Sequence, residues 1–208
     1  MLFSGWRKLG LLSLCTMAAG AAAAQQFQLN STTFSQGGTP PLSMILNNVS
    51  NGVNVCTASG TAGLDQSPEL SWTGVPYGTR SFAVILYDTT AAFTHWGMYN
   101  IQPTVHELSQ NAGVANSTYG PEIMNDFYLG QQYDGPCPPA GVAPEIHSCV
   151  FSVWALSTTL DLSSSANFPA NAETLYHALI KAGVNGQILA HATLTGLYSS
   201  TPGTGHTD

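Results

Sequence analysis

Ser81-Phe82-Ala83-Val84-Ile85-Leu86-Tyr87 is the stretch of sequence that decides the fold. After its first residue the run is continuously apolar and rich in residues that favour strands. It therefore predicts a central strand that is buried on both faces. Similar runs from His95 to Ile101 and from Cys149 to Leu156 predict two further strands of the same kind.

Shorter segments add to this set of strands. Four of them carry strand signals: Phe27–Leu29, Leu42–Leu46, Leu70–Trp72 and Gln187–Tyr198. Residues 47–66 hold few apolar residues and are expected to form a loop. Residues 102–146 are rich in Gly, Pro and Asn, and an irregular region of that length inside a compact domain is usually functional or hides short elements.

One helix is predicted after these strands. Asn171 can cap its start, and Gly183 or Gly186 can end it. Apolar residues recur at three- and four-residue intervals between them, at Leu175, Ala178, Leu179 and Ala182. Runs of strands followed by a late helix, without βαβ alternation, predict an all-β fold: a two-sheet antiparallel β-sandwich with one or two peripheral helices.

The N-terminus has the layout of a Sec signal peptide. Trp6-Arg7-Lys8 forms a short basic head, an apolar run extends from Leu9 to Ala19, and Ala21-Ala22-Ala23-Ala24 offers a small-residue cleavage site. We predict a signal peptide at 1–24, cleaved after Ala24, and a secreted or periplasmic protein. Residues 25–208 are long enough for a single domain, whose tail from about 199 is expected to be disordered.

The charge of the chain limits its partners. Without residues 1–24, only Arg80 and Lys181 stand against eleven Asp and Glu residues, which gives a formal charge near −9. Two basic groups cannot neutralise several phosphates, so nucleic-acid binding is excluded. Nothing indicates attraction to an anionic membrane surface after signal cleavage.

Four polar sites lie at the ends of the predicted strands. Asp88 closes the strand that ends at Tyr87, His95 opens the next strand, and His147 precedes Cys149. A hairpin joining Asp88 to His95 can bring their side chains close together. Gly135-Pro136-Cys137-Pro138-Pro139-Ala140-Gly141 is a stiff loop whose backbone N–H groups, with imidazole, suit an anion site that lacks Arg and Lys.

Several motifs then match one family in order. Ser67-Pro68-Glu69-Leu70-Ser71-Trp72, the diproline loop at 135–141, and His147 followed by Val150-Phe151 resemble the phosphatidylethanolamine-binding (Raf-kinase-inhibitor-like) family, in its bacterial branch. His95-Trp96 with Asn100-Ile101, and Gly196-Leu197-Tyr198, continue the resemblance, which spans about residues 67–198.

The resemblance implies a sandwich with a small pocket at one end that takes phosphate, acetate or a phospholipid head group. It implies ligand-binding roles for six residues: Asp88, His95, Gly135, Pro136, Pro138 and His147. Two departures weaken the expectation of phospholipid binding. The family's Asp-Pro-Asp-x-Pro is here Asp88-Thr89-Thr90-Ala91-Ala92, and its His-Arg-Tyr is here His147-Ser148-Cys149, so the pocket is expected to be less rigid and less cationic.

Three cysteines remain outside the predicted signal peptide. In an oxidising compartment, one disulfide and one free thiol are expected, and sequence spacing does not choose among the three pairings. Cys56 with Cys137 is preferred because both lie in loops that flank the proposed pocket, and Cys137 with Cys149 is the alternative.

The leading hypothesis is therefore an exported binding protein for a small anionic or phosphorylated ligand, with no cofactor, metal or catalytic residue assigned. Two alternatives stay open. Asp and His side chains can perform acid–base chemistry, or can bind zinc if Cys137 or Cys149 joins them, although the sequence has no Gly-x-Ser-x-Gly or His-Glu-x-x-His motif. An inhibitor or protein-interaction role is the other alternative.

Overall fold

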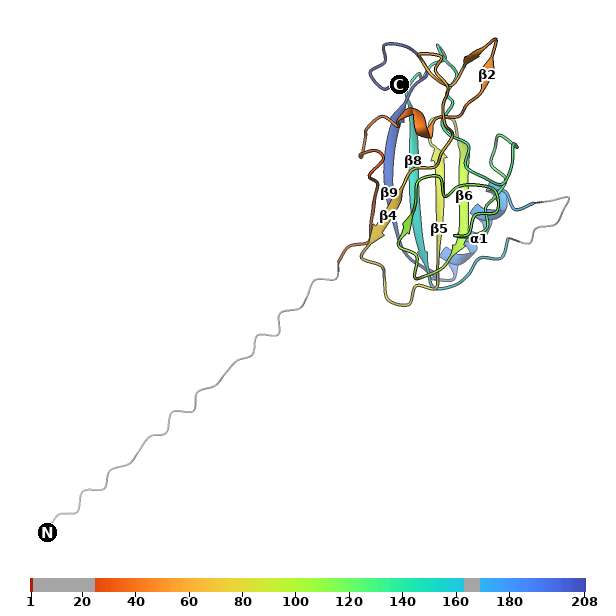
Figure 1. Ribbon diagram of the computed structural model, residues 1–208. Helices are drawn as coiled ribbons and strands as arrows, with labels where there is room; N and C mark the ends of the chain where they lie inside the picture. The colour runs from red at the N-terminus through yellow and green to blue at the C-terminus, as the bar shows by residue number, and fades with distance from the viewer. Residues whose placement is uncertain (2–24, 163–168) are drawn as a thin grey trace.

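A computed structural model describes residues 1, 25–162 and 169–208. Two antiparallel sheets form its body (Figure 1). The larger has the strand order β6-β5-β8-β9, with bounds Phe93–Ile101, Ser81–Asp88, His147–Leu156 and Ile188–Tyr198. The smaller has the order β1-β4-β7, with bounds Gln28–Asn30, Leu70–Thr73 and Glu107–Leu108. The predicted all-β sandwich is confirmed.

Strand β5 lies inside the larger sheet and is buried on both faces, as predicted. Its alternate residues Phe82, Val84 and Leu86 belong to the core between the two sheets. Ala83 and Ile85 point to the opposite face and pack in a second core under the helix. A strand with an apolar layer on each side needs apolar residues at every position, which explains the unbroken run.

The helix α1 (Ala172–Val184) covers this second face. The Asn171 side chain accepts a hydrogen bond from the backbone N–H of Thr174 (3.0 Å), and the Thr174 hydroxyl accepts one from the N–H of Asn171 (2.9 Å). This reciprocal capping box fixes the start of the helix at the predicted residue. Leu175 and Leu179 are buried against the sheet.

The prediction of a strand at Leu42–Leu46 is wrong. Leu42–Met44 forms a 3₁₀ helix, η1, which follows Pro41. Met44 and Ile45 are nevertheless fully buried, so the apolar run was correctly assigned to the interior but not to a strand. A short apolar run that is buried can form a strand or part of a helix. Residues 47–66, expected to be a loop, contain the small hairpin of β2 (Val49–Ser50) and β3 (Val53–Asn54).

The tail after Ser199, predicted from the sequence to be disordered, makes hydrogen bonds within itself and to the domain. The Ser199 N–H donates to the His206 carbonyl (2.8 Å), and the Asp208 carboxylate accepts from the Ala58 N–H (2.7 Å). Polar side chains and backbone groups of this segment thus satisfy part of their hydrogen-bonding capacity. The predicted signal peptide at 1–24 lies outside the described residues, apart from Met1.

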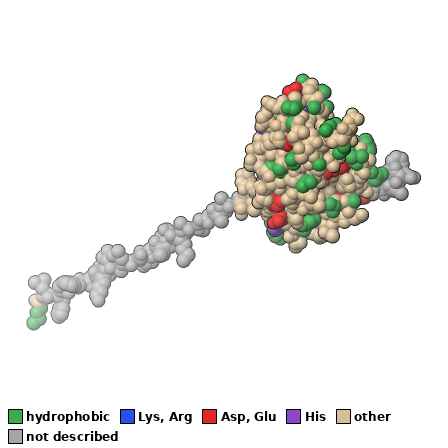
Figure 2. Space-filling view, turned by 45° about the horizontal axis from the view of Figure 1, so that its top comes forward, with side chains coloured by type: hydrophobic (Ala, Val, Ile, Leu, Met, Phe, Trp, Pro, Cys, Tyr) green, Lys and Arg blue, Asp and Glu red, His purple; other side chains and the backbone are tan. Residues whose placement is uncertain are grey.

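The surface is poor in charge. Figure 2 shows a face that is mostly uncharged polar side chains and backbone, with scattered hydrophobic and acidic groups. Among the described residues, no helix combines the length and apolar character needed to cross a bilayer.

Candidate functional site

The strand order brings three predicted residues to one end of the larger sheet. Asp88 is the last residue of β5, His147 is the first of β8, and His95 lies near the start of β6. Because β5 is antiparallel to both neighbours, its C-terminal end lies beside the N-terminal ends of β6 and β8. Residues far apart in the sequence therefore surround one small volume.

Asp88 and His147 form a buried pair. Nδ1 of His147 lies 2.5 Å from one carboxylate oxygen of Asp88, and both side chains are almost fully buried. The other carboxylate oxygen accepts hydrogen bonds from the backbone N–H groups of Thr90 (2.8 Å) and Ala91 (3.1 Å). The carboxylate is therefore fixed by three donors, and His147 keeps Nε2 for another partner.

His95 lies beside Asp88 in the same cavity, but its hydrogen-bond partner is a backbone carbonyl. Its Nδ1 donates to the backbone carbonyl of Asp134 (3.0 Å), whereas Asp88 pairs with His147 rather than with His95. Burial lowers the pKa of His95 below its usual value, and the Asp134 carbonyl and the Asp88 charge oppose this only in part. The ring is therefore neutral near pH 7, with Nε2 as an acceptor.

These three side chains line a cavity of about 200 Å³. Its remaining walls are apolar or nearly so, and are formed by Ala91, Phe93, Phe127, Cys137, Pro138 and Pro139. The rings of Phe93 and Phe127 meet edge to face, with centroids 4.6 Å apart, and both rings approach His95. The volume suits a head group or small acid rather than a drug-sized ligand.

Gly135 and Pro136 do not line this cavity. The Gly135 N–H donates to Oδ1 of Asp65 (2.7 Å), so it is not free for a ligand. A Cβ on Gly135 would overlap the backbone carbonyl of Met44, which explains why glycine is needed at this close approach. The Gly141 N–H is also engaged, by the Thr201 hydroxyl (2.8 Å). The expected set of free backbone donors is therefore reduced by at least these two.

Cys56 and Cys137 form a disulfide, with their Cα atoms 4.4 Å apart, which is the pairing preferred from the sequence. Cys137 lines the cavity, so the bond ties the diproline loop to the loop that follows β3. Cys149 is free and buried, and burial raises the pKa of its thiol. Among the described residues, no group of three or more His, Cys, Asp or Glu side chains is arranged to hold a metal ion.

Three residues of the cavity wall, Phe93, Phe127 and Pro139, were not predicted as site residues from the sequence. Pro139 stands in the diproline loop that was quoted, so that signal was present. Phe93 opens β6, and its ring gave no signal distinct from that of a core residue. Phe127 lies in the irregular region 102–146, where no periodicity marks a residue as inward-facing. Only the folded chain shows that these rings enclose His95.

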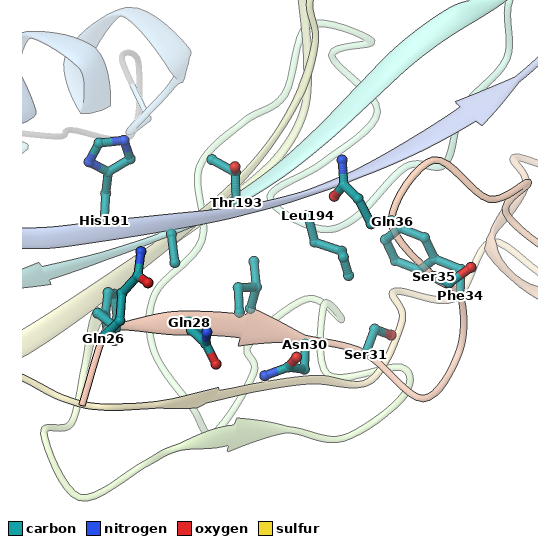
Figure 3. Close-up of a pocket in the computed structure, with 13 residues that line it drawn as sticks. Gln26, Gln28, Asn30, Ser31, Phe34, Ser35, Gln36, His191, Thr193 and Leu194 are labelled. Atoms are coloured by element: carbon teal, nitrogen blue, oxygen red, sulfur yellow. The ribbon is translucent and has the colours of Figure 1, made fainter.

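A larger hollow lies elsewhere, between β1 and β9, with a volume of about 720 Å³ (Figure 3). Its polar side chains do not converge. Figure 3 shows His191 and Thr193 pointing from β9 away from β1, while Gln28 and Asn30 lie on the far side of β1. Ligand sites need a few polar groups that face one another, so the smaller cavity around Asp88 is the better candidate despite its size.

The fold and this cavity define a class of protein. Residues 30–199 match the family model described as phosphatidylethanolamine-binding protein, and the chain belongs to that family.

Particular relatives come from bacteria. UPF0098 protein YbcL of Escherichia coli K12 is 34% identical over 200 residues, covering 90% of this chain and 94% of the relative. A UPF0098 protein of Aquifex aeolicus is 34% identical over 175 residues, covering 82% and 95%.

Solved structures agree with this assignment. The crystal structure of Escherichia coli YbcL, described as a member of the mammalian PEBP family, has a TM-score of 0.65 at 29% identity and covers 84% of this chain and 99% of its own. A putative phosphatidylethanolamine-binding protein homologue, CT736 of Chlamydia trachomatis, has a TM-score of 0.59 at 26% identity, covering 83% and 97%.

Proposed function

We propose that the protein binds a small anionic or phosphorylated group, of the phospholipid head-group type, in the cavity around Asp88, His95 and His147. The observation that carries this proposal is the buried Asp88–His147 pair, 2.5 Å apart, which lines a cavity also lined by a second imidazole. Buried polar groups that face a hollow rather than packed atoms are candidates for ligand contact. The names of the family and of two similar solved structures, which refer to phosphatidylethanolamine binding, support a ligand of the phospholipid head-group type.

The three polar groups offer complementary contacts. His147, when protonated, presents Nε2–H to an anionic oxygen, while its Nδ1–H stays on Asp88. Neutral His95 presents Nε2 as an acceptor, and Asp88 can also accept from an ammonium group. A ligand that carries both an anionic oxygen and an O–H or N–H donor therefore satisfies the site. The rings of Phe93 and Phe127 can contact its carbon atoms.

Calorimetric titration with sn-glycero-3-phosphoethanolamine and with inorganic phosphate tests this proposal. His95→Ala removes one contact and leaves the Asp88–His147 pair in place, so we expect at least about a tenfold loss of affinity. His177→Ala is the matched control, because that histidine is exposed on α1. Equal affinity in the wild type and in His95→Ala, with both folded by circular dichroism, would contradict the proposal.

We also propose that the protein is exported after cleavage of residues 1–24. The basic head and apolar run of that segment and the Cys56–Cys137 disulfide support this, because disulfides persist in oxidising compartments. N-terminal sequencing of the mature protein is expected to begin near Gln25. A mature chain that still begins at Met1 would contradict the proposal.

A further inference from the structure

A second buried polar cluster lies directly behind the cavity and is built on two carboxyl groups. Asp134 is buried, Asp65 is half-buried, and their carboxyl groups lie close enough to act on each other electrostatically. Two ionised carboxylates this close repel each other and neither can donate to the other, so the arrangement favours a proton held by the pair. Neither residue belongs to a motif that the sequence marks as functional.

Further hydrogen bonds fix the orientation of both carboxyl groups. Oδ1 of Asp65 accepts the Gly135 N–H at 2.7 Å. The two oxygens of Asp134 accept from Nδ2 of Asn125 (2.6 Å) and from Nε2 of Gln132 (3.2 Å). Each carboxyl group is therefore held by the pair and by at least one neutral donor.

The same residues hold the walls of the cavity. The backbone carbonyl of Asp134 accepts from Nδ1 of His95 at 3.0 Å, and so sets the tautomer of that ring. Oδ1 of Asn125 accepts the N–H of Phe127, the aromatic wall, at 3.0 Å. Gly135 leads into the segment from Cys137 to Pro139, which forms another wall.

Among the described residues, the titratable groups around the pair are neutral or acidic, so they supply no positive charge that could stabilise two ionised carboxylates. Tyr133 and Cys149 lie close by, and burial raises the pKa of both, so they are neutral near pH 7. Asp88 and Asp126 are acidic groups whose charges act on His95, itself neutral because burial lowers its pKa. Burial likewise raises the pKa of Asp65 to about 7 and raises that of Asp134.

We propose that the Asp65–Asp134 pair is the positioning element of the cavity, and that its shared proton holds His95, Phe127 and the Cys137–Pro139 wall in the arrangement that binds the ligand. This rests on the proposed function. Loss of the proton puts two carboxylates side by side without a cation, and their repulsion moves the backbone at 134–135 to which His95 is bonded.

The test compares wild type with Asp65→Asn, using sn-glycero-3-phosphoethanolamine from about pH 5.5 to about pH 8.5, where its phosphodiester keeps one negative charge. In Asp65→Asn the amide oxygen still accepts from Gly135, and the amide N–H₂ donates to Asp134 without titrating. We expect wild-type affinity to fall by up to about tenfold per pH unit above about pH 7, the limit for one proton. The variant keeps only the fall that groups outside the acid pair cause in both proteins.

Glu122→Gln is the matched control. Burial raises the pKa of Glu122 to about 8, but its side chain bonds Trp96 and does not line the cavity. This variant is expected to keep the wild-type pH dependence of binding. Identical pH profiles for wild type and Asp65→Asn would overturn the proposal.

A second measurement needs no ligand and no variant. The ¹⁵N signals of the His95 ring and the carboxyl ¹³C signal of Asp65 are followed by NMR over the same pH range. We expect the ring signals to move with the Asp65 titration, and ring signals that ignore it would overturn the proposal. Absence of ligand binding at every pH would instead count against the proposed function, while the ring signals still decide the positioning role.

Discussion

Two polar pairs lie beside the same cavity, and they satisfy their charges in opposite ways. Asp88 meets His147 at 2.5 Å and two backbone N–H groups, so a carboxylate is matched by donors. Asp65 meets Asp134, a second acid, and burial raises the pKa values of both. The first pair lines the cavity, whereas the second holds the backbone behind it. Under the positioning role proposed above, the contacts that the cavity offers depend on polar groups one layer further inside.

The largest expected effect is that of breaking the matched pair. Asp88→Ala leaves His147 and the N–H groups of Thr90 and Ala91 buried without their acceptor. We expect a loss of about 3–5 kcal/mol in the free energy of unfolding near pH 7, measured by urea denaturation. Asp88→Asn is the control, because its amide oxygen still accepts from Thr90 and Ala91, and it should cost less. Equal losses in the two variants would show that the hydrogen bonds from Thr90 and Ala91 contribute little, and no loss in either variant would contradict the role of the pair.

A smaller loss in the free energy of unfolding is expected from Gly135→Ala. The added Cβ overlaps the Met44 carbonyl and pushes Gly135 away from Asp65. We expect a loss of about 1–3 kcal/mol, seen as a lower Tm. Gly183→Ala on α1 is the matched control, since its Cβ makes only ordinary contact with Ile188 and should stabilise the helix by up to about 1 kcal/mol. A neutral Gly135→Ala would mean that the loop can move freely.

The smallest effect concerns stability and pH at the acid pair. The folded pKa of Asp65, about 7, lies above its ordinary value of 3.8, so the stability it contributes is fully present below about pH 4 and is lost as pH rises through about 7. Asp65→Asn cannot lose a proton and so escapes this loss. Discounting for solvent screening of a half-buried group, we expect a gain on the order of 1 kcal/mol at pH 8, or about 2–4 °C in Tm.

The matching measurement is calorimetric melting of both proteins at about pH 5 and about pH 8. The difference in Tm between wild type and Asp65→Asn should be larger at the higher pH. A difference that does not change with pH would contradict the raised pKa of Asp65, and with it the contrast between the two pairs.

Much of the fold could be predicted from local patterns. The apolar run at β5 predicted burial on both faces, and Asn171 predicted the start of α1, because strand alternation, helical periodicity and caps depend on neighbouring residues. The strand predicted at Leu42–Leu46 is instead a 3₁₀ helix at Leu42–Met44, because a buried apolar run this short shows neither the period of a strand nor that of a helix. The family could be recognised because its motifs keep their order along the chain.

The candidate site was predicted less completely. Asp88, His95, Pro138 and His147 line one cavity, but Gly135 serves Asp65 and a close backbone contact instead. The partner of each histidine was not predictable, because a hydrogen bond depends on distances of a few tenths of an ångström between segments far apart in sequence.

The sequence by itself determined a low-charge chain of strands with one capped helix, and the order of motifs that marks its family. Only the tertiary structure decided that Asp88 pairs with His147 and that His95 is neutral. It also decided that Asp65 and Asp134 share a buried contact. Local periodicity is set by covalent neighbours, whereas burial, which moves a pKa and selects a partner, exists only after distant segments have packed together.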